Sequence, residues 1–269
     1  MADGLEQVLT PGSLLLTEPA ALLAQQLQDT TAVESILSLI GNGVQTENEL
    51  RRLSQIGKFK LAHYLWELSA LRLIEERQRA FARFAERQER YSLNDPLFRF
   101  YYRCVAPHLN AVQREDTHQL AWAVMAELDA FIQQDVFARL CTDWIFDEGV
   151  HGTLGFIPQW VNDYWPDQPG GSARPLLVAA YPDDRQLFIA EDYWQKTPVG
   201  RQALKNLLQR SQSIPHVNDT DWTVQYGLFA REGFTSAAIA AARKMEARLV
   251  SLLQLESRLH DAVRSSSGI

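Results

Sequence analysis

The spacing of apolar residues in this chain of 269 residues changes beyond Gly149. Before that glycine, apolar residues recur at every third or fourth position, which predicts amphipathic helices. Beyond it, the short apolar runs 175–182 and 186–194 are joined by the turn sequence Pro-Asp-Asp-Arg, which predicts a strand hairpin. The expected fold class is therefore α/β (α+β), with a helical first part and a sheet covered by helices in the second.

Three short helices are expected after residue 31. The first, 32–40, ends at a Gly-Asn-Gly stop. The second begins at Thr46, which forms a capping-box pattern with Glu49 three residues later. The third follows Gly57 and continues the helical spacing of leucines. Two helices separated by a tight turn, with the third helix in the recognition position, are typical of a helix-turn-helix.

Two strand-like segments, 71–77 and 90–93, follow the third helix and complete the order of a winged helix-turn-helix domain over residues 31–95. That region has ten basic and nine acidic residues, whereas the whole chain has a net charge of −7. A broad basic surface is therefore excluded, and any contact with double-stranded DNA would be local. The predicted DNA contacts lie on the third helix and the wing: Lys58, Lys60, His63, Arg79, Arg83 and Arg87.

A strongly aromatic helix is expected next. Asp95 is a suitable N-cap, and Pro96 suits the first helical position because that position needs no N–H donor. Pro107 is expected to end or kink this helix, and the polar stretch 113–118 suggests a hinge. Residues 96–118 are thus interpreted as a linker helix and hinge, which places the second domain at 119–269.

Several segments resemble the C-terminal part of the archaeal-type P-loop ATPases. The run YSLNDPLFRFYYRCVAP (91–107) is similar to the family's segment after its winged helix. IAEDYWQKTPVG (189–200) and YGLFAREGFT (226–235) are similar to two later segments of its C-terminal domain. The opening PGSLLLTEPAALLAQQL (11–27) resembles the end of the ATPase lid, so residues 1–30 are interpreted as a lid-like tail.

The resemblance implies a PD-(D/E)XK nuclease-like fold for residues 119–269. Nucleases of that fold hold divalent cations with two or three carboxylates and use a nearby lysine. Here the family's helical glutamate falls on Ala138, its aspartate falls near Leu176, and its lysine falls on Tyr193. Only Glu191 remains, and one carboxylate binds magnesium weakly. The domain is therefore expected to be degenerate and without catalytic residues.

No cofactor or metal is expected. The phosphate-binding pattern G-x-x-x-x-G-K-[ST] is absent from the sequence, so an ATPase would be a partner or an upstream part of the protein. Two cysteines do not suggest a zinc site or a disulfide framework. One group of residues has the side-chain types of metal ligands: Asp143, Asp147, Glu148 and His151. Gly149 is expected to end the helix that carries them before these side chains converge.

The sequence predicts a non-catalytic DNA-binding and protein-interaction module in the cytoplasm, with an ATPase or a second copy as further partners. A signal peptide and a long apolar span are not seen, so no membrane association is expected. Two alternatives stay open. One is a metal-dependent DNA nuclease with a rearranged PD-(D/E)XK site, and the other is a pure protein-interaction scaffold.

Overall fold

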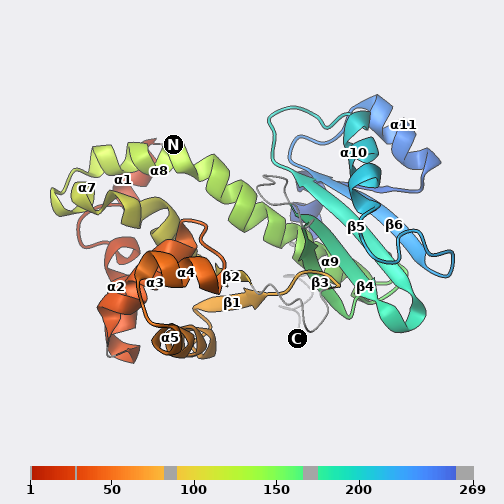
Figure 1. The fold of residues 1–269 in the computed structure, drawn as a ribbon. Coiled ribbons are helices and arrows are strands. Elements are labelled where there is room, and N and C mark those ends of the chain that lie inside the picture. The colour runs from red at the N-terminus through yellow and green to blue at the C-terminus, as the bar shows by residue number, and fades with distance from the viewer. Residues whose placement is uncertain (1, 28, 82–89, 166–174, 259–269) are drawn as a thin grey trace, which may run out of the picture. The chain divides into compact units, whose positions relative to one another are not determined.

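The computed structural model describes residues 2–27, 29–81, 90–165 and 175–258 (Figure 1). Its internal contacts divide the chain into two compact units. The first comprises Met1–Gln78 and Gln88–Asp135, and the second comprises Arg79–Arg87 and Val136–Ile269. The predicted domain boundary at residue 118 therefore lies inside the first unit.

The first unit is mainly helical. Its helices are α1 (Ala2–Val8), α2 (Leu14–Gln26), α3 (Thr30–Gly41), α4 (Glu47–Ser54), α5 (Lys58–Ala70), α6 (Pro96–Phe100), the π-helix η2 (Tyr101–Val105), the 3₁₀-helix η3 (Ala106–His108), α7 (Leu109–Gln113) and α8 (Thr117–Phe131). Strands β1 (Ile74–Arg77) and β2 (Arg90–Leu93) pair antiparallel. Three helices followed by a hairpin is the order that the sequence predicts for residues 31–95.

Two helix starts that the sequence predicts are confirmed. The Thr46 hydroxyl accepts a hydrogen bond from the Glu49 backbone N–H at 3.3 Å, as an N-cap does. The Asp95 carboxylate accepts from the N–H groups of Leu97 and Phe98 at 2.8 and 3.1 Å. Pro107 lies where the aromatic helix changes to the 3₁₀-helix η3, so the predicted distortion at this proline is also found.

One apolar core joins α3, α4, α5 and the hairpin to the aromatic helix. Its fully buried side chains include Ile36, Leu37, Leu50, Leu61, Leu68 and Phe98. Each contributes roughly 1.5–3 kcal/mol by its removal from water. Gly41 allows the close approach of the aromatic helix, because a Cβ there would lie 2.6 Å from Tyr102 Cβ. The predicted linker helix is therefore an internal part of this core.

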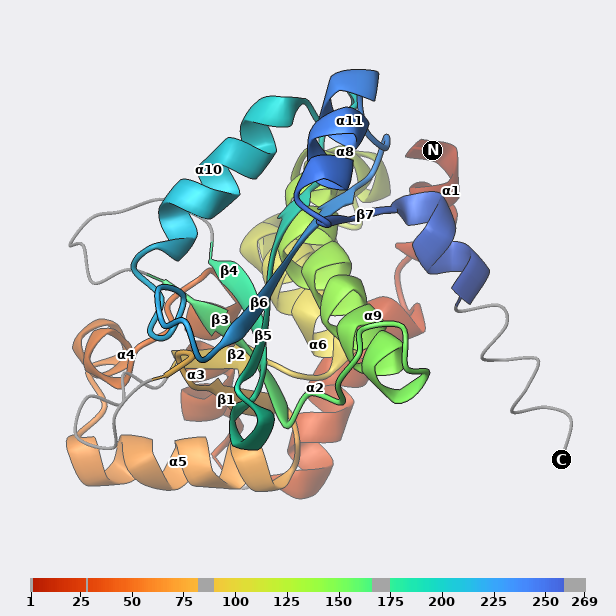
Figure 2. The same ribbon diagram turned by 90° about the vertical axis from the view of Figure 1, so that its right-hand side faces the viewer.

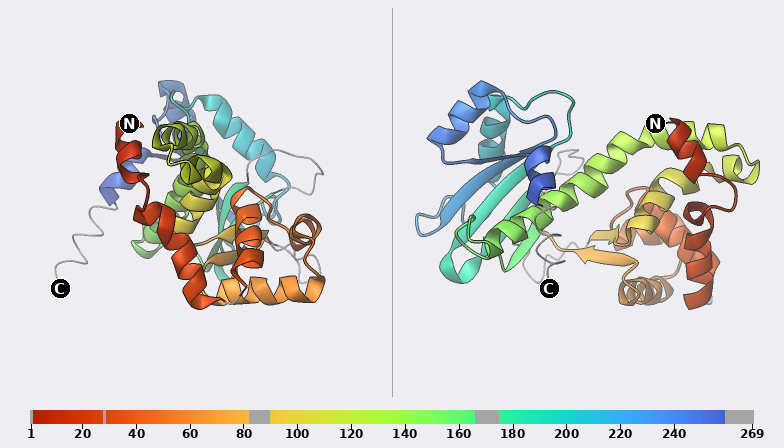
Figure 3. Two further views of the ribbon diagram at one scale, coloured as in Figure 1. Left: turned by 90° about the vertical axis from the view of Figure 1, so that its left-hand side faces the viewer. Right: turned by 180° about the vertical axis from the view of Figure 1, so that it is seen from behind.

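The predicted hinge at residues 113–118 is a short turn between α7 and α8, inside the first unit. Helix α8 packs against α1 and against the π-helix η2, and the right panel of Figure 3 shows α1 beside α8. Leu120, Ala121 and Val124 are buried by this packing. The chain passes to the second unit later, within the π-helix η4 (Ile132–Phe137).

The second unit contains a five-stranded sheet of order β3-β4-β5-β6-β7. Its elements are α9 (Ala138–Val150), β3 (Trp160–Tyr164), β4 (Leu176–Tyr181), the 3₁₀-helix η5 (Pro182–Asp184), β5 (Gln186–Tyr193), α10 (Arg201–Ser211), β6 (Thr223–Ala230), α11 (Ser236–Lys244) and β7 (Arg248–Ser251). Strands β3, β4 and β5 are antiparallel, and the predicted hairpin is β4–η5–β5. Strands β5, β6 and β7 are parallel, with α10 and α11 in the crossovers.

Helices cover both faces of this sheet, as Figure 2 shows with α10 on one side and α9 on the other. Alternate residues of β5 enter different cores, as the two-residue period of a strand requires. Leu187 and Ile189 pack with Leu204 and Leu207 of α10. The intervening residues, including Phe188, pack on the α9 side.

The sequence interpretation omits strands β3 and β7. Strand β3 reads Trp-Val-Asn-Asp-Tyr, and its two central polar residues hide the apolar pattern of a strand. The apolar spacing of segment 236–249 predicts a helix throughout, but α11 ends at Lys244. Glu246 there has φ 54°, and the chain then pairs along β6. Pairing with a buried neighbour strand thus outweighs the local helical propensity of this segment.

Both cysteines are free and fully buried, Cys104 in the first unit and Cys141 in the second. Burial raises the pKa of Cys104 to about 12 and raises the pKa of Cys141 well above its usual value. Among the described residues, no helix has the length and apolarity that crossing a membrane requires.

We expect neither thiol to react with a water-soluble disulfide reagent at pH 8 in the folded protein, because little thiolate forms and the sulfur atoms have no access to solvent. Both should react at once in guanidinium chloride, as measured by the absorbance of the released thiolate. Rapid labelling of one equivalent before unfolding would contradict this buried placement.

Candidate functional site

Glu191, the remaining nuclease-like carboxylate, lies near the end of β5 and is only 6% exposed. It is on the face of the sheet that α10 covers. Arg210 of α10 donates from Nη1 to Glu191 Oε1, and the two side chains form an ion pair. The guanidinium thus neutralises the charge of this carboxylate within the second unit.

Tyr193 completes the environment of this carboxylate. Residues two apart on a strand share a face, and Tyr193 Oη donates to Glu191 Oε2 at 2.9 Å. Each carboxylate oxygen of Glu191 therefore accepts a hydrogen bond from a different side chain. The tyrosine stands where the resemblance places a lysine, and here it binds the glutamate directly.

Asp192 lies on the opposite face of β5, as the alternation of strand residues predicts. It is also buried, at 7% exposure, and its negative charge is one cause of the raised pKa of Cys141 on α9. Glu191 and Asp192 consequently do not converge on one point. The other two family positions carry no acid, with Ala138 at the first position of α9 and Leu176 at the first position of β4. Among the described residues, no group of three or more metal-ligating side chains is found.

Three of the four residues predicted as an acidic group near Gly149 form ion pairs within the second unit: Asp147, Glu148 and His151. Helix α9 extends one residue past Gly149, where a Cβ would meet Pro158 Cδ at 2.4 Å. Glu148 accepts from Arg258 Nε at 2.8 Å, and His151 Nδ1 lies 3.1 Å from Asp147 Oδ1. Asp147 and Glu148 are thus already engaged by partners within the second unit.

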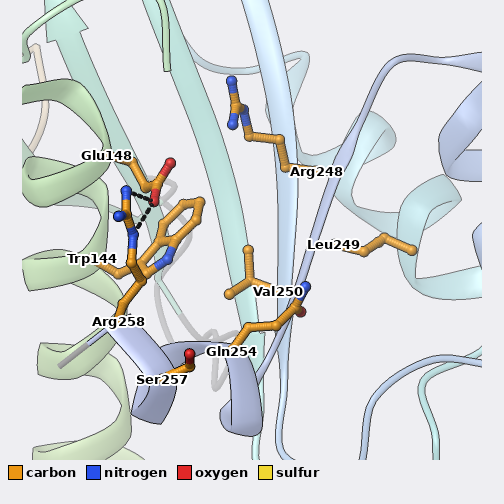
Figure 4. Close-up of a pocket in the computed structure, with 8 residues that line it drawn as sticks. All are labelled: Trp144, Glu148, Arg248, Leu249, Val250, Gln254, Ser257 and Arg258. Atoms are coloured by element: carbon orange, nitrogen blue, oxygen red, sulfur yellow. Dashed lines mark hydrogen bonds and ion pairs between the residues drawn. The ribbon is translucent and has the colours of Figure 1, made fainter. Parts of the chain in front are cut away.

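The pocket beside this ion pair has a volume of about 420 Å³ and lies between α9, β7 and the helical segment 252–258 (Figure 4). Trp144 forms one wall, and the Glu148–Arg258 pair lies against it. Gln254 is engaged as a helix cap, because its side-chain oxygen accepts from the Ser251 N–H at 2.8 Å. The charged side chains of this pocket wall, Glu148 and Arg258, are thus already paired with each other.

The three predicted DNA-contacting residues of the third helix all lie on α5 and are exposed. Lys58 occupies the first turn. Lys60 Nζ forms an ion pair with Asp29 Oδ2 at 3.1 Å, and Tyr64 Oη donates to the same oxygen at 2.6 Å. The hydrogen bond from Tyr64 and then that from Lys60 lower the pKa of Asp29.

An aromatic stripe runs along the solvent face of α5, and the sequence interpretation does not single it out. Phe59 is 91% exposed and Trp66 is 68% exposed, seven residues apart on the same side of the helix. His63 lies between them and stacks on Trp66, with ring centroids 6.4 Å apart and planes inclined by 16°. The sequence signal that could have identified this stripe is the seven-residue spacing of Phe59 and Trp66. It places both rings on a different side of the helix from the buried Leu61, Leu65 and Leu68.

Of the three arginines predicted to contact DNA from the wing, only Arg79 is among the described residues. Arg79 belongs to the second unit, where its guanidinium carbon lies 4.8 Å from the centroid of the Tyr164 ring. The neighbouring Ala80 N–H donates to the Asp163 carbonyl of β3 at 2.9 Å. Arg83 and Arg87 lie outside the described residues.

A scan against protein-family models and a search of curated proteins gave no match to this chain.

We expect Arg210→Ala to lower the free energy of unfolding by about 2–4 kcal/mol, because it leaves a buried carboxylate without its cation. Adding Glu191→Gln should restore much of the loss, since a neutral amide costs less to bury than an unpaired carboxylate. Arg201→Ala, an exposed arginine on the same helix, is the matched control and should change stability by about 0.5 kcal/mol or less. Urea unfolding measures all three variants, and an Arg210→Ala value equal to the control would contradict the ion pair.

Proposed function

We propose that this chain is a non-catalytic interaction module that binds protein through the aromatic stripe of α5, defined by Phe59, His63 and Trp66. The observation that carries this proposal is the exposure of two large aromatic side chains on one helix face. Aromatic residues are enriched at protein interfaces and often supply most of the binding free energy there. A helix that reads a DNA major groove instead presents hydrogen-bonding side chains to the base edges.

The proposal includes the fold that the sequence suggests, with a winged helix in residues 31–95 and a degenerate nuclease-like domain in the second unit. The order of three helices and an antiparallel hairpin supports the first part. The ion pair of Glu191 with Arg210 supports the second, because a metal ion would compete with a guanidinium already bound to the carboxylate. This arrangement also favours the scaffold over a nuclease with a rearranged site.

Local DNA binding is the second candidate, and the first turn of α5 favours it. Lys58 and Lys60 lie beside the helix N-terminus, where backbone N–H groups and the helix dipole attract phosphate. The chain's net charge of −7 opposes this binding, as does the engagement of Lys60 with Asp29. Two further parts of the proposal have other grounds. The cytoplasmic location rests on the two cysteines, which do not suggest a disulfide framework, and the ATPase partner rests on the resemblance alone.

A photo-cross-linking amino acid at position 66 tests the proposal in cells that produce the full chain. We expect one discrete cross-linked protein band, which Phe59→Ala abolishes because that substitution removes the other end of the stripe. The same amino acid at position 122 is the control, since Trp122 is 58% exposed but lies on α8. Absence of a band that depends on Phe59 would contradict protein binding by the stripe.

Fluorescence anisotropy with a short labelled DNA duplex at low salt tests the second candidate function, local DNA binding. We expect the same weak signal from the wild-type chain and from Lys58→Glu/Lys60→Glu. Salt-sensitive binding that the double substitution removes would instead support DNA contact by α5.

A further inference from the structure

The pocket of the second unit is lined by side chains from two elements that face each other, α9 and β7 (Figure 4). Trp144 and Glu148 are one turn apart on α9, so they share a side of that helix. Arg248 and Val250 are two residues apart on β7, so they share a face of that strand. Val250 packs in the same core as Trp144, which places this face of β7 toward α9. The pocket volume of about 420 Å³ is within the range of about 300–1,000 Å³ that is usual for small-molecule sites.

Arg248 is a cation of this pocket without an acidic partner among the described residues. Its Nη2 donates to the backbone carbonyl of Thr153, which is a neutral acceptor. The guanidinium of Arg258, in contrast, lies 2.7 Å from Glu148 Oε1 and 3.7 Å from Asp147 Oδ2. The acids beside the pocket are thus opposed by Arg258, and the charge of Arg248 is left uncompensated. Because Arg248 is half-buried, water screens its charge less than at an open surface, and an anion in the pocket is attracted to it.

Trp144 gives the pocket an aromatic wall. Its indole meets the ring of Phe229 edge to face, with centroids 5.3 Å apart and planes inclined by 81°. This contact holds the indole in place, while the Trp144 side chain stays half-buried and lines the pocket. Val250 adds an apolar surface from β7. A flat aromatic ring stacked on the indole would therefore be removed from water by apolar groups of both elements.

We propose that this pocket binds a small aromatic carboxylate, with its ring on Trp144 and its carboxylate on Arg248. A guanidinium matches a carboxylate because its planar fork donates two parallel hydrogen bonds. An aliphatic acid lacks the ring contact and a neutral aromatic molecule lacks the charge contact, so the pocket selects a ligand that has both. One ring contact and one ion pair give a dissociation constant of roughly 0.1–1 mM. This site is independent of the α5 stripe, which belongs to the first unit.

Isothermal titration calorimetry on the full chain at low salt tests the proposal with three probes of related shape. Naphthoate has the aromatic ring and the carboxylate, naphthamide replaces the carboxylate by a neutral amide, and cyclohexanecarboxylate keeps the charge without the aromatic ring. We expect naphthoate to bind about tenfold more tightly than either of the other two, because it alone makes both contacts. Equal affinity for naphthoate and naphthamide would overturn the role of Arg248, and equal affinity for naphthoate and cyclohexanecarboxylate would overturn that of Trp144.

Variants of Arg248 place the binding in this pocket. Arg248→Gln should weaken naphthoate binding about tenfold and leave naphthamide binding unchanged, since the glutamine amide can still donate to the Thr153 carbonyl but carries no charge. Arg248→Lys should recover part of the loss, because it restores the charge without the planar fork. Arg243→Gln, which changes an exposed arginine on α11, is the matched control and should bind naphthoate like the wild type, and circular dichroism confirms that each variant is folded.

Two results would overturn the proposal. One is a wild-type chain that does not bind naphthoate at concentrations well above the expected dissociation constant. The other is naphthoate binding that Arg248→Gln leaves unchanged, which would place the ligand elsewhere on the chain. Neither result bears on the cross-linking at position 66, so the proposed function of the α5 stripe is tested separately.

Discussion

Strand β5 is paired on both edges and covered by helices on both faces, and this constraint governs the chemistry of the second unit. A charged side chain on such a strand has little access to water, so it requires a partner inside the protein. Glu191 finds two, Arg210 from α10 and Tyr193 from its own strand. The crossover β5–α10–β6 is what brings the arginine back over the end of β5.

The same principle recurs where the sequence suggested other sites. Glu148 is bound by Arg258, and Lys60 is bound by Asp29. In each case the charge is used to hold two elements of one unit together. The α5 helix differs, because two of its large aromatic side chains, Phe59 and Trp66, are exposed to solvent. The exposed rings of α5 are the feature on which the proposed protein binding rests.

Much of the fold followed from local signals. Thr46 and Asp95 cap helices as their sequence contexts predict, and the Pro-Asp-Asp-Arg turn joins two antiparallel strands. Strands β3 and β7 could not be predicted in this way, because their pairing with β4 and β6 decides their structure. The site was predictable only in part. The alternation that separates Glu191 from Asp192 follows from strand geometry, whereas the contact with Arg210 depends on the packing of α10, which no local pattern encodes.

The central claim is that Glu191 is committed to an internal ion pair and does not hold a cation. A titration of the full chain with Mn²⁺, followed through the paramagnetic resonance signal of the free ion, tests it directly in the wild type and in Glu191→Gln. The account predicts identical titration curves for the two proteins. One equivalent of bound Mn²⁺ in the wild type that Glu191→Gln removes would contradict it.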